Sequence, residues 1–414
     1  MPSSGSTSSR GSGAARGSWV LWGSELSPFA LKVEALLRFA EVPFRWLPAT
    51  GPFADAVRYE WRRRGVVAGR RSLTWPPLTP LDEFPQVPYL FGPDGENLYD
   101  SSAIGAWLAE QAPGRTARTA SLLPSGDGAL RFCARLVDEA LDEVGLYLVH
   151  HNRWVVAARD NDAGLRLARE LRPLLGPLAA GLAWTFPARQ VRRLPYLFSV
   201  APPNITTWAD LPARLRPPAR TGFPPTHALL EQAFADLLAV VEPVFAQRPY
   251  LFGEQFTLAD ASLYGQLCMN RKDPSAWAWI RRTAPRTAAW VDRLAVGDFA
   301  AHRTDGAVAV DATVAPLLAW ICRTFVPLMH QNHAAWERHH TAGETVFNEA
   351  AFDAGRTLYD GVLLDYPFRS VAKTFQVRVW QDLRRDWDAL DGTARARLER
   401  LLPPAHGLDR DASA

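Results

Sequence analysis

The residues with the clearest chemical potential lie in the segment Ser27-Pro28-Phe29, which follows a short apolar run. Pro28 suits the first turn of a helix, and Ser27 stands at the N-cap position in front of it. A hydroxyl there can donate a hydrogen bond to a bound sulfur, and the helix dipole favours negative charge. Such a site would lower the pKa of a thiol from about 8.5 towards neutrality and so favour its nucleophilic form. Ser27 is therefore either a thiol-activating hydroxyl or a plain helix cap, with Ser24 as a second candidate.

Two later segments have residue types that could bind the ends of a small peptide. Val87-Pro88 stands directly before a predicted hairpin, and Asp100-Ser101 stands directly before a predicted helix. Helix N-terminal N–H groups and a serine hydroxyl can hold a carboxylate, and an aspartate can pair with an ammonium group. A plain helix cap remains the alternative for Asp100-Ser101.

The elements that must position these residues follow from the apolar pattern. An apolar strand at 19–22, a helix at 30–40 and a second strand at 42–47 predict a β-α-β opening. Residues 89–91 and 97–99 are apolar runs on either side of Pro-Asp-Gly-Glu, which predicts a hairpin. The stretch between these two units is less regular, and its prolines exclude a long helix at its end.

This order of elements and motifs resembles the thioredoxin-like N-terminal domain of the glutathione S-transferase superfamily, in its serine-type, bacterial-like members. The resemblance implies that Ser27 activates the thiol of glutathione. It implies a cis-proline turn at which the Val87 backbone pairs with the cysteinyl part of glutathione, and a γ-glutamyl site at the second helix start. Asp replaces the more usual Glu or Gln at that start. The implied glutathione-binding residues are Phe29, Val87, Pro88, Asp100 and Ser101.

The second half of the chain has a helical pattern. Apolar residues recur at helical spacing along 130–148 and again along 230–244. Tyr250 to Gly253 followed by Thr257 to Asp260 resembles the family's signature before its late core helix. Thr257 and Asp260 have the spacing of a capping box, so this motif is structural.

These patterns predict an α/β plus all-α protein: a thioredoxin-like domain, a helical domain of the glutathione S-transferase C-terminal type, and extra helices. Val326-Pro327 and Tyr366-Pro367 predict that the extension is broken into several short helices that pack on the second domain. The predicted boundaries are a disordered tail at 1–17, the first domain at 18–112, a linker at 113–127, the helical domain at 128–298 with an irregular insertion at about 186–225, a helical extension at 299–402, and a tail at 403–414.

The second substrate has only a provisional site in the sequence. The first long helix of the second domain offers Tyr147, His151 and Trp154 as pocket residues, with His150 beside them. Core packing explains Tyr147 and Trp154 equally well. The four histidines between 330 and 340 complete no recognisable metal motif, so we expect no metal.

Composition narrows the classes of partner. The three cysteines lie far apart in apolar contexts, which favours core thiols over disulfides. A net charge of +3 does not indicate nucleic acid, although arginine runs at 62–64 and 189–193 either form solvated surface or attract an anionic ligand. No run is long and apolar enough for a membrane span. A cytoplasmic location is expected, since the sequence shows no secretory signal.

The predicted function is that of a glutathione transferase. Glutathione acts as cosubstrate, and its thiolate attacks a small, apolar electrophile, as in detoxification. The resemblance also implies a homodimer. Two alternatives remain open at this stage: a glutathione-dependent isomerase or thiol-lytic enzyme, and a non-catalytic binding or scaffold protein with the same fold.

Overall fold

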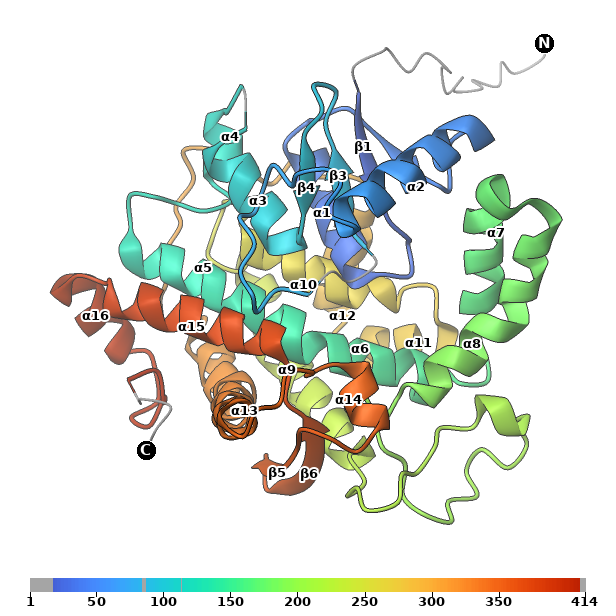
Figure 1. Cartoon of the computed structure of the whole chain (residues 1–414). Coiled ribbons are helices and arrows are strands. Elements are labelled where there is room, and N and C mark those ends of the chain that lie inside the picture. The colour runs from blue at the N-terminus through green and yellow to red at the C-terminus, as the bar shows by residue number, and fades with distance from the viewer. Residues whose placement is uncertain (1–17, 84–86, 113, 410–414) are drawn as a thin grey trace, which may run out of the picture.

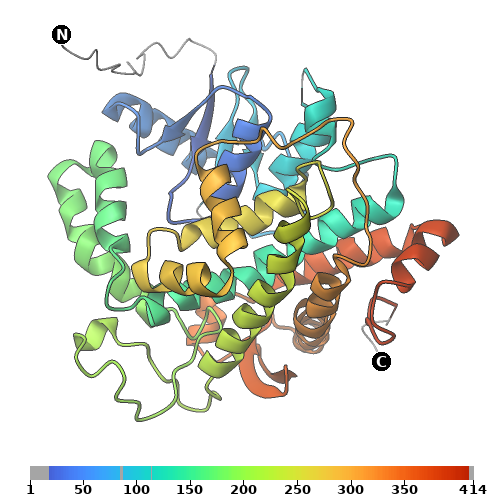
Figure 2. The same cartoon turned by 180° about the vertical axis from the view of Figure 1, so that it is seen from behind.

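The computed structural model describes residues 18–83, 87–112 and 114–409. The predicted tail at 1–17 and the last five residues of the tail at 403–414 lie outside the described residues. A small mixed sheet with its helices sits above a helical domain, and the C-terminal extension folds back along that domain (Figure 1). The same arrangement seen from behind shows α9 (His227–Gln247, yellow-green) and α12 (Pro285–Ala295, gold) on the opposite side of the helical domain (Figure 2).

The N-terminal domain is a four-stranded sheet in the order β2-β1-β3-β4. β1 and β2 are parallel because α1 crosses over between them, and β3 returns antiparallel to β1. The predicted β-α-β opening, the hairpin and the helix after Asp100 are confirmed. The elements are β1 (Trp19–Trp22), α1 (Pro28–Phe39), β2 (Phe44–Leu47), α2 (Phe53–Val67), β3 (Tyr89–Phe91), β4 (Asn97–Tyr99) and α3 (Ser101–Glu110).

Helix α2 was not predicted, and its composition explains why. Its only buried residues are Ala56, Gly65 and Val66, while Phe53 and Trp61 are exposed. The segment therefore has no continuous apolar stripe from which a helical period could be recognised.

The helical domain is organised around one long, nearly continuous helix. α5 passes through a π-helical turn, α6 and a second π-helical turn without a break, from Gly128 to Val156. The predicted apolar stripes along 130–148 and 230–244 are buried, and the capping box at Thr257 is present. The helices are α4 (Ala117–Ala120), α5 (Gly128–Ala140), α6 (Leu146–His151), α7 (Ala163–Leu175), α8 (Leu182–Arg192), α9 (His227–Gln247), α10 (Leu258–Met269), α11 (Pro274–Thr283) and α12 (Pro285–Ala295); the π-helical turns are Leu141–Gly145 and Asn152–Val156, and the 3-10 segments are Gly176–Gly181 and Ala213–Leu215.

The extension differs from the helical segment that was predicted at 299–402. It contains a β-hairpin whose two-residue turn, Leu364-Asp365, has positive φ at both positions, as a type I′ turn requires. Leucine is rarely found there, so the sequence lacked the usual turn signal. The elements are α13 (Ala315–Thr341), α14 (Glu349–Asp353), β5 (Leu358–Leu363), β6 (Tyr366–Val371), α15 (Thr374–Asp388) and α16 (Gly392–Glu399).

The two predicted proline breaks in the extension were wrong as helix ends. Pro327 lies inside the 27-residue helix α13. Much of that helix is buried, and this packing outweighs the cost of an internal proline, about 3 kcal/mol. Pro367 lies in β6 of a two-stranded sheet, where an edge position tolerates a residue without an N–H group.

The N-terminal and helical domains meet where α1 packs against α10. Gly265 makes this approach possible: a Cβ atom there would lie 2.5 Å from the Pro28 carbonyl oxygen and 2.9 Å from Lys32 Cβ. Beside this contact, the buried Lys32 ammonium lies 2.6 Å from Asp138 Oδ1 and 2.7 Å from Asp142 Oδ2. One buried apolar cluster continues from the sheet through the helical domain into the extension. The start of α1 is therefore held rigidly against the helical domain.

Some remaining expectations concern particular side chains. The three cysteines are free thiols; Cys133 and Cys322 are buried, while Cys268 is partly accessible. In the histidine group, His330 and His339 contact the backbone carbonyls of Gly407 and Leu358. Within the described residues no helix is long and apolar enough to cross a membrane.

Candidate functional site

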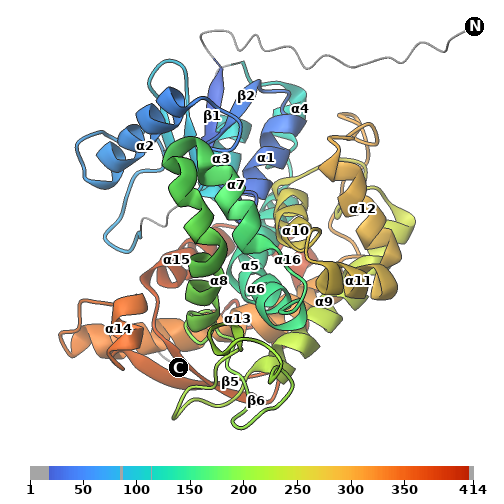
Figure 3. The same ribbon diagram turned by 90° about the vertical axis from the view of Figure 1, so that its right-hand side faces the viewer.

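A cleft of about 1630 Å³ separates the N-terminal domain from α7, α8 and the irregular chain that follows them. Seen from the side, α7 and α8 stand next to the N-terminal domain, and α2 lies beside α7 (Figure 3). Of the predicted glutathione-binding residues, Ser27, Phe29 and Val87 line this cleft.

The sheet register explains why Ser27 and Val87 come together although they lie far apart in the sequence. Trp22 at the end of β1 pairs with Tyr89 at the start of β3. The residues after Trp22 and those before Tyr89 must then leave the sheet at the same edge. The Val87-Pro88 peptide bond is cis, as the resemblance implied, and Pro88 itself is buried.

Ser27 is the N-cap of α1, so the simpler interpretation of this residue holds. Its side-chain oxygen accepts a hydrogen bond from the Ala30 N–H at 3.4 Å. That bond uses a lone pair of the oxygen, and no acceptor for the hydroxyl proton is found among the described residues. Ser27 can therefore cap the helix and still donate its O–H into the cleft.

The turn before Ser27 is anchored from the helical domain by buried ionic groups. Arg153 Nη1 donates to the Leu26 carbonyl at 2.9 Å, and its Nε lies 2.8 Å from Asp273 Oδ2. The other carboxylate oxygen of Asp273 lies 2.5 Å from Arg166 Nη2. All three ionic side chains are at most 5% exposed. Because each charge has a partner, the turn is held in one position without an unpaired buried charge.

Ser24, the second serine candidate, has a different role. Its hydroxyl donates to Glu170 Oε2 at 2.5 Å, and the Glu25 N–H donates to Glu170 Oε1 at 2.9 Å. Burial raises the pKa of Glu170 to about 7, although these two hydrogen bonds act in the opposite direction. Ser24 thus positions the turn on α7, and its proton is not available to a ligand.

The predicted γ-glutamyl site is absent from the cleft lining. Asp100 caps α3 through the Ala103 N–H at 2.9 Å, and its carboxylate lies 3.7 Å from Arg378 Nη2 of α15. Arg378 Nε also lies 2.7 Å from Asp82 Oδ1. Ser101 is 4% exposed and donates to Asp142 Oδ2 at 3.3 Å. Ser101 is thus buried against the helical domain. Arg378 of the C-terminal extension pairs with the Asp100 carboxylate, the group expected to meet an ammonium group of the ligand.

The candidate pocket residues on the long helix lie on two different faces. Trp154 and His150 line the cleft together with Leu146. Tyr147 lies outside the cleft, and its hydroxyl accepts from Lys373 Nζ at 2.6 Å. His151 is 1% exposed and lies 3.0 Å from Ser199 Oγ. Helical spacing alone would have separated 146, 150 and 154 from 147 and 151, because residues four apart share a face.

His150 is a neutral imidazole in this cleft. Burial and, to a smaller extent, the nearby guanidinium groups of Arg153 and Arg193 lower its pKa to about 3. Arg153 and Arg193 are themselves paired with Asp273 and Glu349, so they add little net positive charge to this end of the cleft.

The arginine runs at 62–64 and 189–193 are predicted either to form solvated surface or to attract an anionic ligand. The run at 189–193 lines the cleft from the end of α8. In the run at 62–64, only Arg63 lines it, while Arg62 donates to the Glu96 carbonyl and to Asn97 Oδ1. The structure thus brings the run at 189–193 to the cleft, whereas in the run at 62–64 Arg62 holds α2 against the sheet and Arg64 pairs with Glu60 of its own helix.

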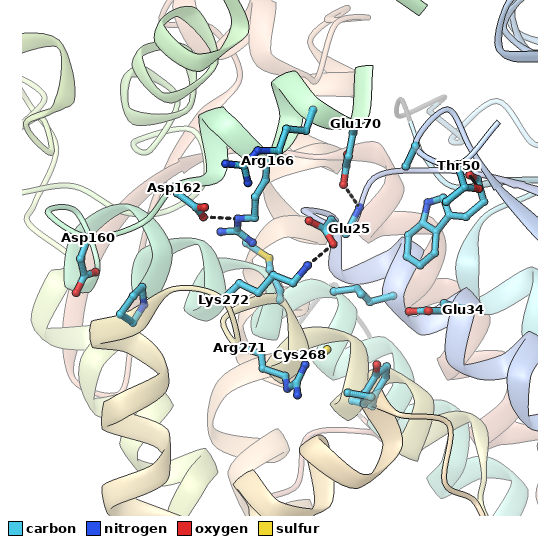
Figure 4. A pocket seen from close by; sticks show the side chains of 18 residues that line it. Glu25, Glu34, Thr50, Asp160, Asp162, Arg166, Glu170, Cys268, Arg271 and Lys272 are labelled. Carbon is cyan, nitrogen blue, oxygen red and sulfur yellow. Dashed lines mark hydrogen bonds and ion pairs between the residues drawn. The ribbon is translucent and has the colours of Figure 1, made fainter. Parts of the chain in front are cut away.

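A second groove, of about 870 Å³, lies on the opposite side of the turn that contains Glu25. Four of its charged side chains form two ion pairs: Lys272 with Glu25 at 2.5 Å, and Arg166 with Asp162 at 2.7 Å (Figure 4). Glu170 lines both grooves. These two pairs leave those four charges with little attraction for a ligand.

Two protein-family models match the chain. The N-terminal domain of glutathione S-transferases matches residues 26–111, and the C-terminal domain of glutathione S-transferases matches residues 225–296. These matches support a relationship of the chain to the glutathione S-transferase superfamily. The fold is accordingly a thioredoxin-like N-terminal domain with a small sheet followed by a helical C-terminal domain.

Solved structures align with the chain at low identity, and no curated protein matches it. A glutathione S-transferase from Pseudomonas fluorescens is 18% identical, with a TM-score of 0.30, over 66% of this chain and 93% of that one. One from Ceriporiopsis subvermispora in complex with glutathione is 14% identical, with a TM-score of 0.37, over 68% and 96%. One from Methylobacillus flagellatus with glutathione bound is 16% identical, with a TM-score of 0.33, over 69% and 99%.

Proposed function

We propose that this protein is a glutathione transferase of the serine type, in which Ser27 stabilises the thiolate of glutathione. The observation that supports this most directly is that the Ser27 side chain and the Val87 backbone turn line one cleft. The cysteinyl part of glutathione would lie along Val87, which brings its sulfur to the start of α1. Phe29 and Trp154 would contact the ligand from the two domains. A small electrophile would be the second substrate, and the predicted homodimer and cytoplasmic location remain predictions.

The chemistry assigned to Ser27 needs only groups that the chain has at this position. The hydroxyl donates to the sulfur while its oxygen still accepts from Ala30 N–H. The positive end of the α1 dipole favours the thiolate over the thiol. The thiol proton leaves to solvent, and the thiolate attacks an electrophilic carbon of the second substrate to form a C–S bond. His150 stays neutral and does not compete for that proton near neutral pH.

The test is calorimetric titration of glutathione into the parent and into Ser27→Ala, with thiolate absorbance of each complex followed across pH. We expect both to bind and only the parent to lower the thiol pKa. Ser27→Gly is the matched variant, because glycine is accepted at an N-cap and adds neither a hydroxyl proton nor a charge. Ser24→Ala is the control for a nearby serine and should retain the lowered pKa. Absence of glutathione binding to the parent at millimolar concentration would refute the proposal.

A second candidate is a non-catalytic protein with this fold, and the surroundings of Asp100 favour it. The pairing of Asp100 with Arg378 and the burial of Ser101 close the expected γ-glutamyl site. On this alternative the cleft binds a ligand without activating a thiol. The same titration separates the two candidates, since a ligand that binds with an unchanged thiol pKa in both parent and Ser27→Ala supports the second.

A further inference from the structure

The charges that line the cleft are strongly unbalanced. Eight arginines and three glutamates contribute to its lining, and one of the glutamates is Glu170, whose pKa is raised to about 7. The lining arginines are Arg63, Arg153, Arg189, Arg192, Arg193, Arg214, Arg216 and Arg220. Such a lining favours anions wherever its guanidinium groups are not already paired within the protein.

Most of these arginines already have partners in the protein. Four lie near acidic side chains: Arg63 near Glu60, Arg153 near Asp273, Arg193 near Glu349, and Arg220 near Asp353. Two others are held locally, Arg214 over the Trp184 ring and Arg216 by the carbonyls of Leu211 and Ala209.

Arg189 and Arg192 differ from the rest. Across the described part of the chain, neither guanidinium has a hydrogen bond or an ion pair to a protein group. They lie three residues apart on α8 and so share a helix face. Two like charges at this spacing repel each other, and an anion between them would relieve that repulsion.

The side of the cleft that α7 and α8 form, which includes these two arginines, also has an apolar lining. Leu171 and Leu174 of α7 and Leu182 and Phe186 of α8 line it, and the Phe186 ring packs edge-on against Trp154 at 5.9 Å. A ligand that fills this half of the cleft therefore meets an apolar surface with two free guanidinium groups at its end.

We propose that the second substrate is an amphipathic anion, with an apolar electrophilic body between α7 and α8 and a carboxylate, sulfonate or phosphate bound by Arg189 and Arg192. This rests on the proposed function, because it names the class of its second substrate. Arginine suits such a group since its planar fork can donate two parallel hydrogen bonds to one anion. The thiolate bound at Ser27 attacks the apolar body, and the anionic group takes no part in the reaction.

The test compares 4-chloro-3-nitrobenzoate with its neutral counterpart, 4-chloro-3-nitrobenzamide. In both, the sulfur attacks the carbon that bears chlorine, a C–S bond forms, and chloride leaves with the electrons of the broken C–Cl bond. Each kcat/KM is divided by the uncatalysed rate constant with glutathione. In the Arg189→Gln/Arg192→Gln variant we expect the benzoate value to fall about tenfold and the benzamide value by less than about twofold. Arg172→Gln, an exposed change on α7 outside the cleft lining, should alter neither.

Calorimetry with the same two compounds, without thiol, separates this inference from the proposed function. The benzoate should bind the parent more tightly than the benzamide, with an affinity that falls at higher salt and in the double variant. That pattern without turnover would refute the transferase and retain the anion site. Equal affinity for both compounds, or a double variant that weakens both alike, would overturn the inference whether or not turnover is seen.

Discussion

The starts of α1 and α3 belong to the same small domain and use the same local chemistry, yet their surroundings are opposite. Ser27 and Asp100 each cap a helix through a backbone N–H three residues later. Ser27 opens onto the cleft, whereas Asp100 is paired with Arg378 of the extension. A helix cap is thus decided locally, and its availability to a ligand is decided by what the rest of the chain packs against it.

The largest effect should come from Lys32, which connects the two helix starts. It lies on α1, and Asp142, one of its two carboxylate partners, accepts the Ser101 hydroxyl. We expect Lys32→Met to lower the free energy of unfolding by about 3–5 kcal/mol, because two buried carboxylates lose their cation. Urea unfolding followed by tryptophan fluorescence measures this. Arg38→Gln, on the more exposed part of the same helix, should cost about 1 kcal/mol or less, and a similar loss in both variants would contradict the assignment.

Gly265→Ala tests whether the contact between α10 and α1 sets the position of Ser27. The new Cβ would lie 2.5 Å from the Pro28 carbonyl oxygen, so α1 must shift. We expect a loss of about 3 kcal/mol, the upper end for overpacking, together with weaker thiol binding. Gly392→Ala is the control because nothing lies within 4 Å of its added Cβ. Thermal unfolding and glutathione titration give the two readouts, and normal binding by Gly265→Ala would show that this contact does not position the site.

Glu170 holds the turn that precedes Ser27 at the open helix start. It should make the stability of the protein depend on pH. Its pKa is raised from 4.5 to about 7 by burial, so the folded state holds the proton more tightly than the unfolded state. Its contribution is full at low pH and is lost as the pH rises through about 7. Roughly 2 kcal/mol of the decline should disappear in Glu170→Gln, whose amide keeps an acceptor for the Ser24 hydroxyl. Unfolding free energies measured across this range would show an unchanged slope if another group is responsible.

Arg378→Gln should give the smallest change in stability but bears most directly on the covered helix start. Asp100 and Asp82 would lose a partner, at a cost of about 1 kcal/mol for partly exposed pairs. We expect glutathione affinity to rise, because the Asp100 carboxylate becomes available to the ligand's ammonium group. Arg385→Gln, a change to an exposed arginine on the same helix, is the control. Unchanged affinity in isothermal titration would mean that this carboxylate does not contribute to ligand binding.

Local patterns determined the elements that hold the candidate site. The apolar strands, the Ser-Pro helix start, the Pro-Asp-Gly-Glu turn and the helical stripes all act over a few residues, so they could be recognised without the fold. The same reasoning failed for α2, which has no apolar stripe, and for the β5-β6 hairpin, whose turn places leucine at a positive φ. α2 is instead held by contacts with distant residues, such as that of Arg62 with Asn97, and the hairpin by the pairing of its two strands.

By itself, the sequence determined which residues could cap a helix, form a hydrogen bond with a ligand or attract an anion. These are Ser27, Val87-Pro88, Asp100-Ser101 and the arginines at 189–193. Only the tertiary structure decided which of them share a cleft. It placed Ser27, Val87 and Arg189 in the lining of one cleft. It also paired the Asp100 carboxylate with Arg378, a residue 278 positions later in the chain. The physical reason is that capping and charge are properties of single residues and short segments, whereas burial and charge pairing depend on contacts between distant parts of the chain.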